Sequence, residues 1–375
     1  MKLLVDATPL HAGGGVQVAL AFLDQLCRSS TEFVVALPQP LEAALPPSVR
    51  ESLEGRIHFL SKSSLLDKLI AGARLSRIER DFAPDATFTV FGPAYFHAKS
   101  PHLVGFALGN LLYPRSDMPD RSVRTQILDA LRIRLFRRAD HLVAETHTVR
   151  DLLIKRLKLN PDKVSVIGNS VNPILAQFPP TPLPEEAPVR ILVPSAYYPH
   201  KNLEVVPEVA HAMRQMGCAD VRFELTLPHE STDWHRIAAR AAALGVATNV
   251  TSLGVLRIDK LAAAYQNARL IFLPTIRESS TAVYPESFYF RRPLVTSDMP
   301  FARELCGDAA RFAPPNDPRA AASILLSLLD NPQSSAALID AGRRQLDRQY
   351  PTADQKFAAQ MTLLEQVATA RRPGA

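Results

Sequence analysis

The sequence predicts an α/β protein built from two doubly wound domains with parallel sheets. Three observations lead to this prediction. Short runs rich in Val, Ile and Leu alternate with longer amphipathic runs, as they do in repeated βα units. The alternation restarts after a proline-rich stretch near the middle of the chain. A chain of 375 residues, 47% hydrophobic and 21% charged, is long enough for two globular domains of ordinary size.

The first half of the chain contains six predicted strands, with segments between them long enough for helices. The first strand begins at Lys2, so the opening residues read as a buried strand rather than as a secretion signal. The predicted strands are residues 2–5, 33–36, 86–90, 103–106, 141–144 and 163–167.

Residues 178–186, Phe-Pro-Pro-Thr-Pro-Leu-Pro-Glu-Glu, are predicted to form a stiff linker between the domains. We therefore expect one domain in residues 1–178 and a second in residues 187–350, followed by a C-terminal segment, 351–375, whose residues 353–369 suit a helix. Strands of the second domain are predicted at residues 190–194, 221–227, 249–253, 270–273 and 294–296.

Composition excludes several classes of protein. The longest apolar runs fall well short of the roughly 20 residues that a membrane-spanning helix needs, and a cytoplasmic location is expected. Three cysteines, Cys27, Cys218 and Cys306, lie far apart without the paired spacing of zinc sites, so buried free thiols are expected. The pI near 9.3 comes without basic-aromatic interleaving or a nucleic-acid-binding motif, so no nucleic acid partner is expected.

The positive charge is concentrated in the first half of the chain. Residues 1–184 carry 22 Lys and Arg against 17 Asp and Glu, and much of the excess lies in the basic amphipathic stretch 121–138. One interpretation is a helix packed on its own domain with a solvated arginine face. The other is a helix that contacts anionic lipid head groups, which would place the protein at the inner face of the cell membrane.

Three consecutive glycines, Gly13, Gly14 and Gly15, lie between the first predicted strand and the amphipathic run that starts at Val18. Glycines let backbone N–H groups approach a ligand closely, and a helix start behind them favours negative charge. The glycine run therefore indicates an anion-binding loop, although a flexible turn without a ligand would look the same. Its spacing fits neither Gly-x-Gly-x-x-Gly nor a Walker loop.

Two glutamates follow the strand expected at residues 270–273. Glu278 lies in the loop, and Glu286 lies in the following helix, with seven residues between them. Open parallel sheets bind ligands at this edge. Two carboxylates there suit a sugar nucleotide, because one can accept hydroxyls of a sugar ring and the other the ribose diol. A diphosphate would then meet the N–H groups of the helix start between them, at Ser280, Thr281, Ala282 and Val283.

These residues resemble the retaining glycosyltransferases of family 4, which have the GT-B fold. In that family a Glu, seven residues, a second Glu and a short helix precede Pro-Val-Val-x-Ser, which is similar to Pro293-Leu294-Val295-Thr296-Ser297 here. The resemblance runs from about residue 191 to 329 and is thinner in the first half. Further matches, in the order of the family, are Gly254, Tyr265, Ala268, Pro274, Arg303-Glu304-Leu305 and Gly307-Asp308-Ala309-Ala310.

The resemblance implies two Rossmann-like domains that face one another across a cleft, with a last helix that crosses back to the first domain. It implies a donor site in the second domain, where Lys201 contacts the diphosphate, Glu278 the donor sugar, Glu286 the ribose and Gly254 the nucleotide. The glycine run is similar to the Gly-Gly loop of the family, next to the diphosphate and the acceptor. A solvated helix-start lysine is the alternative for Lys201.

The chain departs from the family at several positions. Ser195 stands where an arginine of the family would pair with Lys201, and a hydroxyl donates one neutral hydrogen bond where arginine donates charged, bidentate ones. Asn110 stands near the place of a catalytic histidine and can supply a hydrogen bond but no proton transfer. The glycines of the Glu-Gly-Phe-Gly motif are replaced by hydroxyl residues, and the glycine that usually ends the following helix is Arg291.

The sequence therefore predicts a retaining glycosyltransferase that moves a sugar from a nucleotide-sugar donor, a UDP- or GDP-sugar, to a glycan or lipid-linked glycan. No Asp-x-Asp motif is present, and we expect no metal and no other cofactor. Two alternatives stay open. One is a sugar-nucleotide epimerase or phosphorylase of the same fold, and the other is a degenerate subunit that binds or scaffolds without catalysis.

Overall fold

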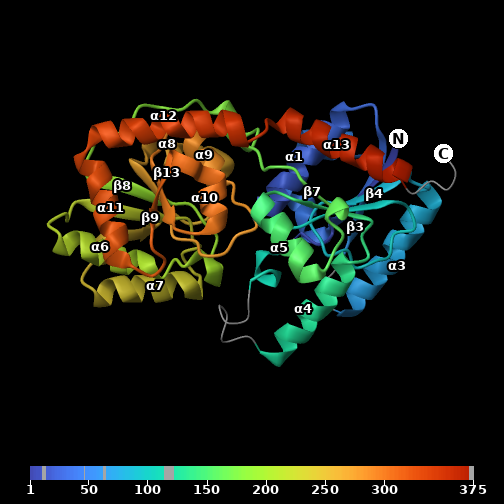
Figure 1. The fold of residues 1–375 in the computed structure, drawn as a ribbon, viewed down its shortest axis with the longest axis horizontal. Helices are drawn as coiled ribbons and strands as arrows, with labels where there is room; N and C mark the ends of the chain where they lie inside the picture. Colours follow the sequence, from blue (N-terminus) through green and yellow to red (C-terminus); the bar gives the residue numbers. More distant parts are fainter. Residues whose placement is uncertain (11–13, 46, 62–64, 114–121, 371–375) are drawn as a thin grey trace. The chain divides into compact units, whose positions relative to one another are not determined.

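The computed structural model describes residues 1–10, 14–45, 47–61, 65–113 and 122–370, and the chain divides into two units (Figure 1). Unit 1 comprises Met1–Asn169 together with Thr352–Ala375, and unit 2 comprises Ser170–Pro351. Unit 1 is thus made of two separate pieces of chain, whereas unit 2 is continuous. The first crossing between the units comes before the proline-rich stretch 178–186, which therefore belongs to unit 2.

Unit 1 contains a seven-stranded parallel sheet in the order β3-β2-β1-β4-β5-β6-β7. The order reverses between β1 and β4, which pair directly, so this is the point where a doubly wound sheet leaves room at the carboxyl ends of its strands. The strands are β1 (Lys2–Asp6), β2 (Glu32–Pro38), β3 (Ile57–Leu60), β4 (Ala86–Thr89), β5 (His102–Gly105), β6 (His141–Ala144) and β7 (Val164–Val166).

Helices cover both faces of this sheet, as buried parallel strands require. α1 (Gly14–Arg28), α2 (Pro47–Ser52) and α13 (Ala353–Ala370) share one apolar cluster with side chains such as Val5 and Phe88. α3 (Leu65–Phe82), α4 (Val123–Phe136) and α5 (His147–Leu157) pack on the opposite face.

α13 is held on unit 1 by apolar packing and by a buried ion pair. Leu363 and Leu364 belong to the same core as α1. The Lys356 ammonium donates to Glu145 Oε1 at 2.8 Å and to Asn169 Oδ1 at 3.0 Å, and all three side chains are largely buried. Because Asn169 is the last residue of unit 1 before the chain crosses to unit 2, this cluster fixes the segments beside both crossings.

Unit 2 contains a six-stranded parallel sheet in the order β10-β9-β8-β11-β12-β13, again with a reversal, here between β8 and β11. α6 (Val205–Gln215), α7 (Thr232–Ala243) and α11 (Pro318–Asp330) cover one face (Figure 1). α8 (Ile258–Asn267), α9 (Val283–Tyr289), α10 (Pro300–Cys306) and α12 (Pro332–Gln349) cover the other. The strands are β8 (Val189–Val193), β9 (Val221–Leu225), β10 (Val250–Ser252), β11 (Leu270–Leu273), β12 (Leu294–Ser297) and β13 (Ala310–Ala313).

The predicted α/β class with two doubly wound sheets is confirmed. Each predicted strand is present, with ends within two residues of the prediction. Two edge strands were not predicted, β3 and β13. Both are short, and a polar residue, His58 or Arg311, interrupts the apolar run on which strand prediction depends.

The proline-rich stretch is bound to unit 2 by Arg292, whose side chain is almost fully buried. Its guanidinium donates to the carbonyl oxygens of Tyr265 at 2.8 Å, Thr181 at 3.0 Å and Gln266 at 2.7 Å. Burial lowers the pKa of Arg292 to about 10. The preceding residue, Arg291, has a φ of 57°, so it adopts the left-handed conformation that a glycine would take without strain.

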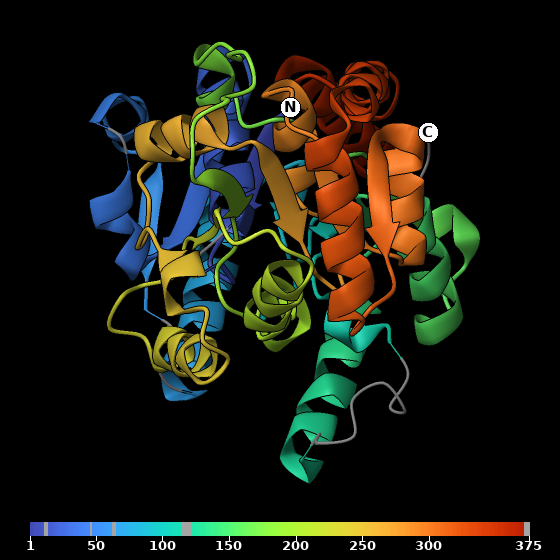
Figure 2. The ribbon, with the colours of Figure 1, turned by 90° about the vertical axis from the view of Figure 1, so that its left-hand side faces the viewer.

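α4 exposes most of its apolar side chains instead of burying them. Phe136 and Asp129 are its buried residues, whereas Val123 and Ile127 are 71% and 65% exposed. The end of the helix that begins at Val123 projects from unit 1 (Figures 1 and 2). The interpretation of this helix as one packed on its own domain by an apolar face is therefore wrong for its first two turns. Among the described residues, no helix is long and apolar enough to cross a membrane.

The three cysteines are free thiols, as predicted. Cys306 is fully buried in unit 2, and burial raises the pKa of its thiol well above the usual value. Cys27 and Cys218 are only half-buried, so the expectation of full burial holds for one of the three.

Candidate functional site

The carboxyl ends of β8 and β11 bring together the polar residues that the sequence singled out in the second half. β8 leads to Ser195 and to the short helix η6 (Pro199–Lys201), and β11 leads to the loop that carries Glu278. Because β8 and β11 are neighbours at the point of strand-order reversal, these two connections lie side by side.

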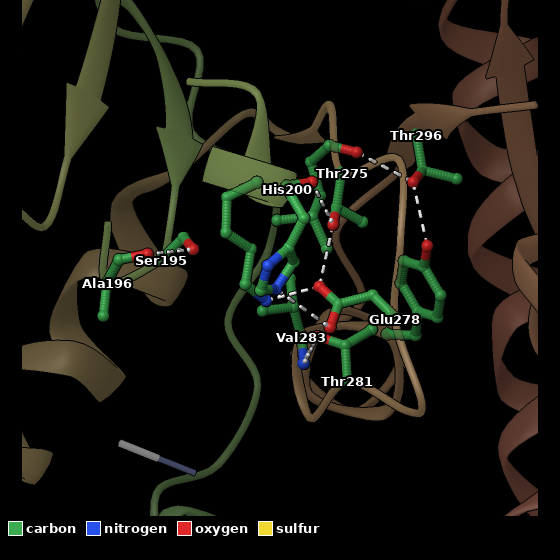
Figure 3. Close-up of polar contacts among 11 residues, drawn as sticks. Ser195, Ala196, His200, Thr275, Glu278, Thr281, Val283 and Thr296 are labelled. Atoms are coloured by element: carbon green, nitrogen blue, oxygen red, sulfur yellow. Dashed lines mark hydrogen bonds and ion pairs between the residues drawn. The ribbon is translucent and has the colours of Figure 1, made fainter. Parts of the chain in front are cut away.

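Lys201 and Glu278 form an ion pair at this edge of the sheet, in which the lysine ammonium donates to Glu278 Oε1. Thr275 also donates its hydroxyl proton to Glu278 Oε1, at 2.8 Å (Figure 3). The side chains of Lys201 and Glu278 are 14% and 7% exposed. In such surroundings the pair is screened little by water, so each charge depends on the other.

The loop after β11 is also joined to η6 through the backbone. The carbonyl oxygen of His200 accepts a hydrogen bond from the amide of Ile276 at 2.9 Å. Thr275 Oγ1 lies 3.1 Å from the same oxygen, so its one hydroxyl proton is shared between His200 and Glu278. These contacts fix the backbone of both connections, and the side chains of residues 200, 201 and 278 consequently converge.

His200 lies against Glu278 and is mostly buried. Its Nε2 is 3.9 Å from Glu278 Oε2, and its ring stacks on Tyr198 with centroids 5.5 Å apart. Its Nδ1 is enclosed and has no hydrogen-bond partner among the described residues. Burial lowers the pKa of His200, and the charge of Glu278 acts in the opposite direction.

Glu286 sits in a different environment, in the first turn of α9. Its carboxylate accepts a hydrogen bond of 2.7 Å from the hydroxyl of Tyr265 in α8, and both side chains are buried. Burial raises the pKa of Glu286 to about 7, while the hydrogen bond from Tyr265 acts to lower it. Glu278 thus pairs with a charged side chain, Lys201, whereas Glu286 pairs with a neutral one, Tyr265.

The residues between the two glutamates form the turn into α9. Ala282 is the N-cap residue of this helix, and the amide of Val283 donates to Thr281 Oγ1 at 3.3 Å. The hydroxyl oxygen of Ser280 is buried without a partner among the described residues. One amide of the helix start is thus already engaged by a side chain, which the sequence did not predict.

Ser195 does not direct its hydroxyl toward Glu278. The hydroxyl donates to the carbonyl of the next residue, Ala196, at 2.8 Å, and the Ser195 amide donates to Thr226 Oγ1 at 2.9 Å. Figure 3 shows Ser195 well to the side of His200 and Glu278. This residue supplies no counterpart of the arginine that the family has at this position.

Gly254 follows β10 and has a φ of 73°, which favours glycine. Its amide donates to Ser252 Oγ at 3.0 Å. An added Cβ would lie 3.2 Å from Nε2 of His229, so a side chain at this position would crowd that ring.

The predicted site residues of the first half are only partly described. Gly13 lies outside the described residues, and so does the side chain of Asn110, whose backbone is in the short helix η2 (Gly109–Leu111). Gly14 and Gly15 open α1, so the helix starts four residues before Val18 and includes two of the glycines. At Gly15 an added Cβ would lie 3.1 Å from Leu10 and 3.4 Å from Phe91, so this turn of the helix needs a small residue.

Within the described part of the chain, no group of three or more His, Cys, Asp or Glu side chains is arranged to hold a metal ion. Sequence reasoning did not predict the contact between Thr275 and the carbonyl of His200 or the pairing of Tyr265 with Glu286. Both contacts join residues from different elements, which a pattern along the chain does not reveal.

Comparison with known proteins supports the same assignment in both halves. Residues 176–345 match the family described as Glycosyl transferases group 1, and residues 12–175 match Glycosyltransferase Family 4. The O-antigen chain mannosyltransferase RfbU of Salmonella typhimurium is 23% identical over 199 residues, which are 53% of this chain and 53% of that protein. The match therefore spans about half the length of this curated relative.

Solved structures share the fold at low identity. A sucrose-phosphate synthase from Thermosynechococcus elongatus superposes with a TM-score of 0.79 at 15% identity, covering 99% of this chain and 100% of the other. Anabaena HepE, solved in complex with UDP and glucose, gives a TM-score of 0.76 at 14% identity, with coverage of 98% and 100%. The lipopolysaccharide glycosyltransferase WaaG gives 0.73 at 12% identity over the full length of both chains.

Each of these structures superposes on this chain over nearly its whole length, and the two family matches adjoin and cover most of the sequence. The chain belongs to the family 4 glycosyltransferases and has the GT-B fold.

Proposed function

We propose that the protein transfers a sugar from a nucleotide-sugar donor to a glycan or lipid-linked glycan, with retention of the anomeric configuration, and that unit 2 binds the donor. The ion pair of Lys201 and Glu278 at the β8–β11 edge is the observation on which this proposal rests. HepE, which shares the fold, was solved with UDP and glucose bound, and this supports a nucleotide sugar as the donor class. A UDP- or GDP-sugar is proposed here.

Lys201 and Glu278 can both bind the donor while the ion pair between them stays intact. An ammonium has three protons to donate, so Lys201 can hold Glu278 with one and diphosphate oxygens with the others. A carboxylate has about four acceptor positions, so Glu278 can also accept hydroxyl protons of the donor sugar. Glu286 would accept the ribose hydroxyls with the capacity that Tyr265 leaves free.

For retention, the acceptor hydroxyl attacks from the face that the diphosphate leaves, and an oxygen of the departing diphosphate takes its proton. The protein then has to position the reactants and stabilise the negative charge that develops on the diphosphate. Lys201 is placed for this role in unit 2. We propose that this chemistry needs no metal ion.

A donor panel tests this function. We expect one of UDP-, GDP-, ADP- and CMP-sugars to raise the melting temperature, and a chelator to leave that shift unchanged. Incubation with the selected donor and a glycan acceptor should give a product whose anomeric configuration, measured by NMR, equals that of the donor. Donor binding with no transfer to any acceptor would favour a scaffold subunit, and conversion of the donor without acceptor would favour an epimerase.

We further propose that the first turns of α4 lie on a membrane surface that contains anionic lipid. Apolar side chains on the exposed face, with arginines toward the end of the helix, are the features of an interfacial helix. Val123, Ile127 and Leu131 recur at helical spacing and are 71%, 65% and 48% exposed, and Leu128 is 42% exposed. Arg134 continues the same face toward the C-terminal end of the helix, and Arg138 follows two residues after that end; both are exposed.

Co-sedimentation with vesicles tests this surface. We expect the protein to pellet with vesicles that contain phosphatidylserine and to stay in solution with phosphatidylcholine alone. Replacing Arg132, Arg134, Arg137 and Arg138 by Gln should release it, since each basic residue near an anionic surface contributes about 1 kcal/mol. Arg77→Gln with Arg80→Gln, two exposed positions of α3, is the control and should leave binding unchanged. Equal pelleting with both kinds of vesicle would overturn the proposal.

A further inference from the structure

We propose that His200 is a donor-binding residue that takes up a proton when a diphosphate binds, and that its imidazolium supplies the second positive charge beside Lys201. This inference rests on the proposed function, because it assumes a nucleotide sugar in unit 2. It assigns to His200 the charge that Ser195 lacks.

The position of the ring is fixed before any ligand arrives. The carbonyl of His200 is held by Ile276 and Thr275, and the ring is stacked on Tyr198 with 16° between their planes. The imidazole therefore keeps its edge toward Glu278 without help from a ligand.

One ring nitrogen has a partner nearby and the other has none. Nε2 faces Glu278 Oε2 at 3.9 Å, close enough for electrostatic attraction but too long for a hydrogen bond. Nδ1 is enclosed and makes no hydrogen bond within the described residues. An enclosed polar atom without a partner costs free energy, so donor binding that brings an acceptor to Nδ1 would remove this cost.

The surrounding charges show what kind of ligand fits. Lys201 and Arg277 act on the ring with positive charge, and among the described residues Glu278 acts on it with negative charge. Tyr198 contacts the ring by stacking. The local balance is positive, which favours an anion, and a phosphate oxygen is an acceptor to which Nδ1–H of the imidazolium and the Lys201 ammonium can both donate.

Binding and protonation follow from this balance. Burial, Lys201 and Arg277 lower the pKa of His200 in the free protein, so the ring is mainly neutral at pH 7. A diphosphate beside it adds negative charge and raises that pKa. Only the imidazolium donates from both nitrogens, to Glu278 and to the diphosphate at once. The gain in affinity is complete below the pKa of the free ring and is lost as the pH rises through the pKa of the bound ring.

The experiment measures proton uptake directly. UDP-glucose and GDP-mannose are used as probes because their diphosphates do not titrate near neutral pH. Calorimetric titrations at pH 7 in buffers of different ionisation enthalpy should show uptake of a substantial fraction of a proton by the wild-type protein. The dissociation constant should fall severalfold when the pH is lowered from 8 to 6.

His200→Phe keeps an aromatic ring for the stack on Tyr198 but cannot be protonated, and His200→Gln keeps a polar group of similar reach. Both variants should bind the probe more weakly, without proton uptake and without the pH dependence. His235→Gln, at an exposed position of α7, is the control and should behave as wild type. Far-UV circular dichroism and melting curves establish that each variant is folded.

The outcomes separate this inference from the proposed function. Binding of a nucleotide sugar by the wild type without proton uptake, or with equal uptake in both His200 variants, would overturn the role of His200 alone. Failure of the wild type to bind either probe at any pH would overturn the donor assignment, and this inference with it.

Discussion

Lys201 and Glu278 lie 77 positions apart in the sequence, yet their side chains form a direct ion pair where β8 and β11 end. Each residue alone is an ordinary surface type. Together, and nearly buried, they make a charged pair at the edge of the sheet where ligands bind in doubly wound folds. The mutational predictions for the donor site follow from this pair.

Lys201→Ala should weaken binding of a nucleoside diphosphate roughly ten- to a hundredfold, because a hydrogen bond to a charged group contributes about 1.5 to 3 kcal/mol. Binding of the matching nucleoside should change little, since the lysine is proposed to contact phosphate. Isothermal titration of UDP against uridine, and GDP against guanosine, measures both. Lys260→Ala, an exposed position of α8, is the control. Equal losses for nucleoside and diphosphate would place Lys201 outside the site.

Glu278→Ala and Glu286→Ala should have different effects. Loss of Glu286 removes an acceptor for ribose hydroxyls, so nucleotide affinity should fall, by about 1.5 to 3 kcal/mol. Loss of Glu278 should mainly reduce the rate of transfer and the selectivity for the donor sugar. Comparing dissociation constants for nucleotide with steady-state rates separates the two. A folded Glu286→Ala protein with wild-type nucleotide affinity would contradict the role assigned to Glu286.

Glu286 should also make stability depend on pH. The folded protein raises the pKa of this carboxyl to about 7, above its value in the unfolded chain, so the neutral form is favoured by folding. This contribution is complete below pH 4.5 and is lost as the pH rises through about 7. Glu286→Gln cannot ionise, so the variant should gain stability relative to wild type between pH 5 and pH 8, by at most about 3 kcal/mol. Urea titrations at both pH values test this, and parallel pH profiles of the two proteins would refute it.

Arg291 and Arg292 should respond in opposite ways to substitution. Arg291→Gly relieves a left-handed backbone and should raise the free energy of unfolding by about 0.5 to 1 kcal/mol, after the extra freedom of glycine in the unfolded chain is allowed for. Arg292→Leu strips hydrogen bonds from the carbonyls of Thr181, Tyr265 and Gln266 and should cost about 3 kcal/mol or more. Chemical denaturation measures both. A neutral Arg292→Leu would mean that water replaces the guanidinium there.

The sequence was sufficient to predict the two sheets, because buried parallel strands leave continuous apolar runs such as Leu270–Leu273. Glu278 was selected because it follows a strand at the edge where such sheets bind ligands, and Lys201 was selected through the resemblance to the family. Their direct pairing was not predictable from local pattern, because it depends on which strands become neighbours. The burial of Glu286 beside Tyr265 has the same origin.

The exposed face of α4 shows a different limit. Apolar residues at helical spacing normally indicate a face that packs on a core. Here Ile127 and Leu131 follow that spacing and yet point to solvent, while Asp129 is buried. The spacing of apolar residues predicts a helix but does not tell what covers its apolar face. Which face of α4 is exposed therefore had to come from the structure.

The split of unit 1 into two pieces of chain has a consequence for biosynthesis. A ribosome makes β1 to β7 first, but the apolar surface around Phe22 and Phe88 is completed by Phe357 and Leu364, which emerge only after all of unit 2. Until then the nascent first unit carries an exposed apolar surface, and Glu145 lacks the lysine that pairs with it in the complete fold. Unit 2, made from one continuous stretch, has no such delay and can finish folding first. A chain that ends before Thr352 would therefore be prone to aggregation and would not fold into a smaller functional protein.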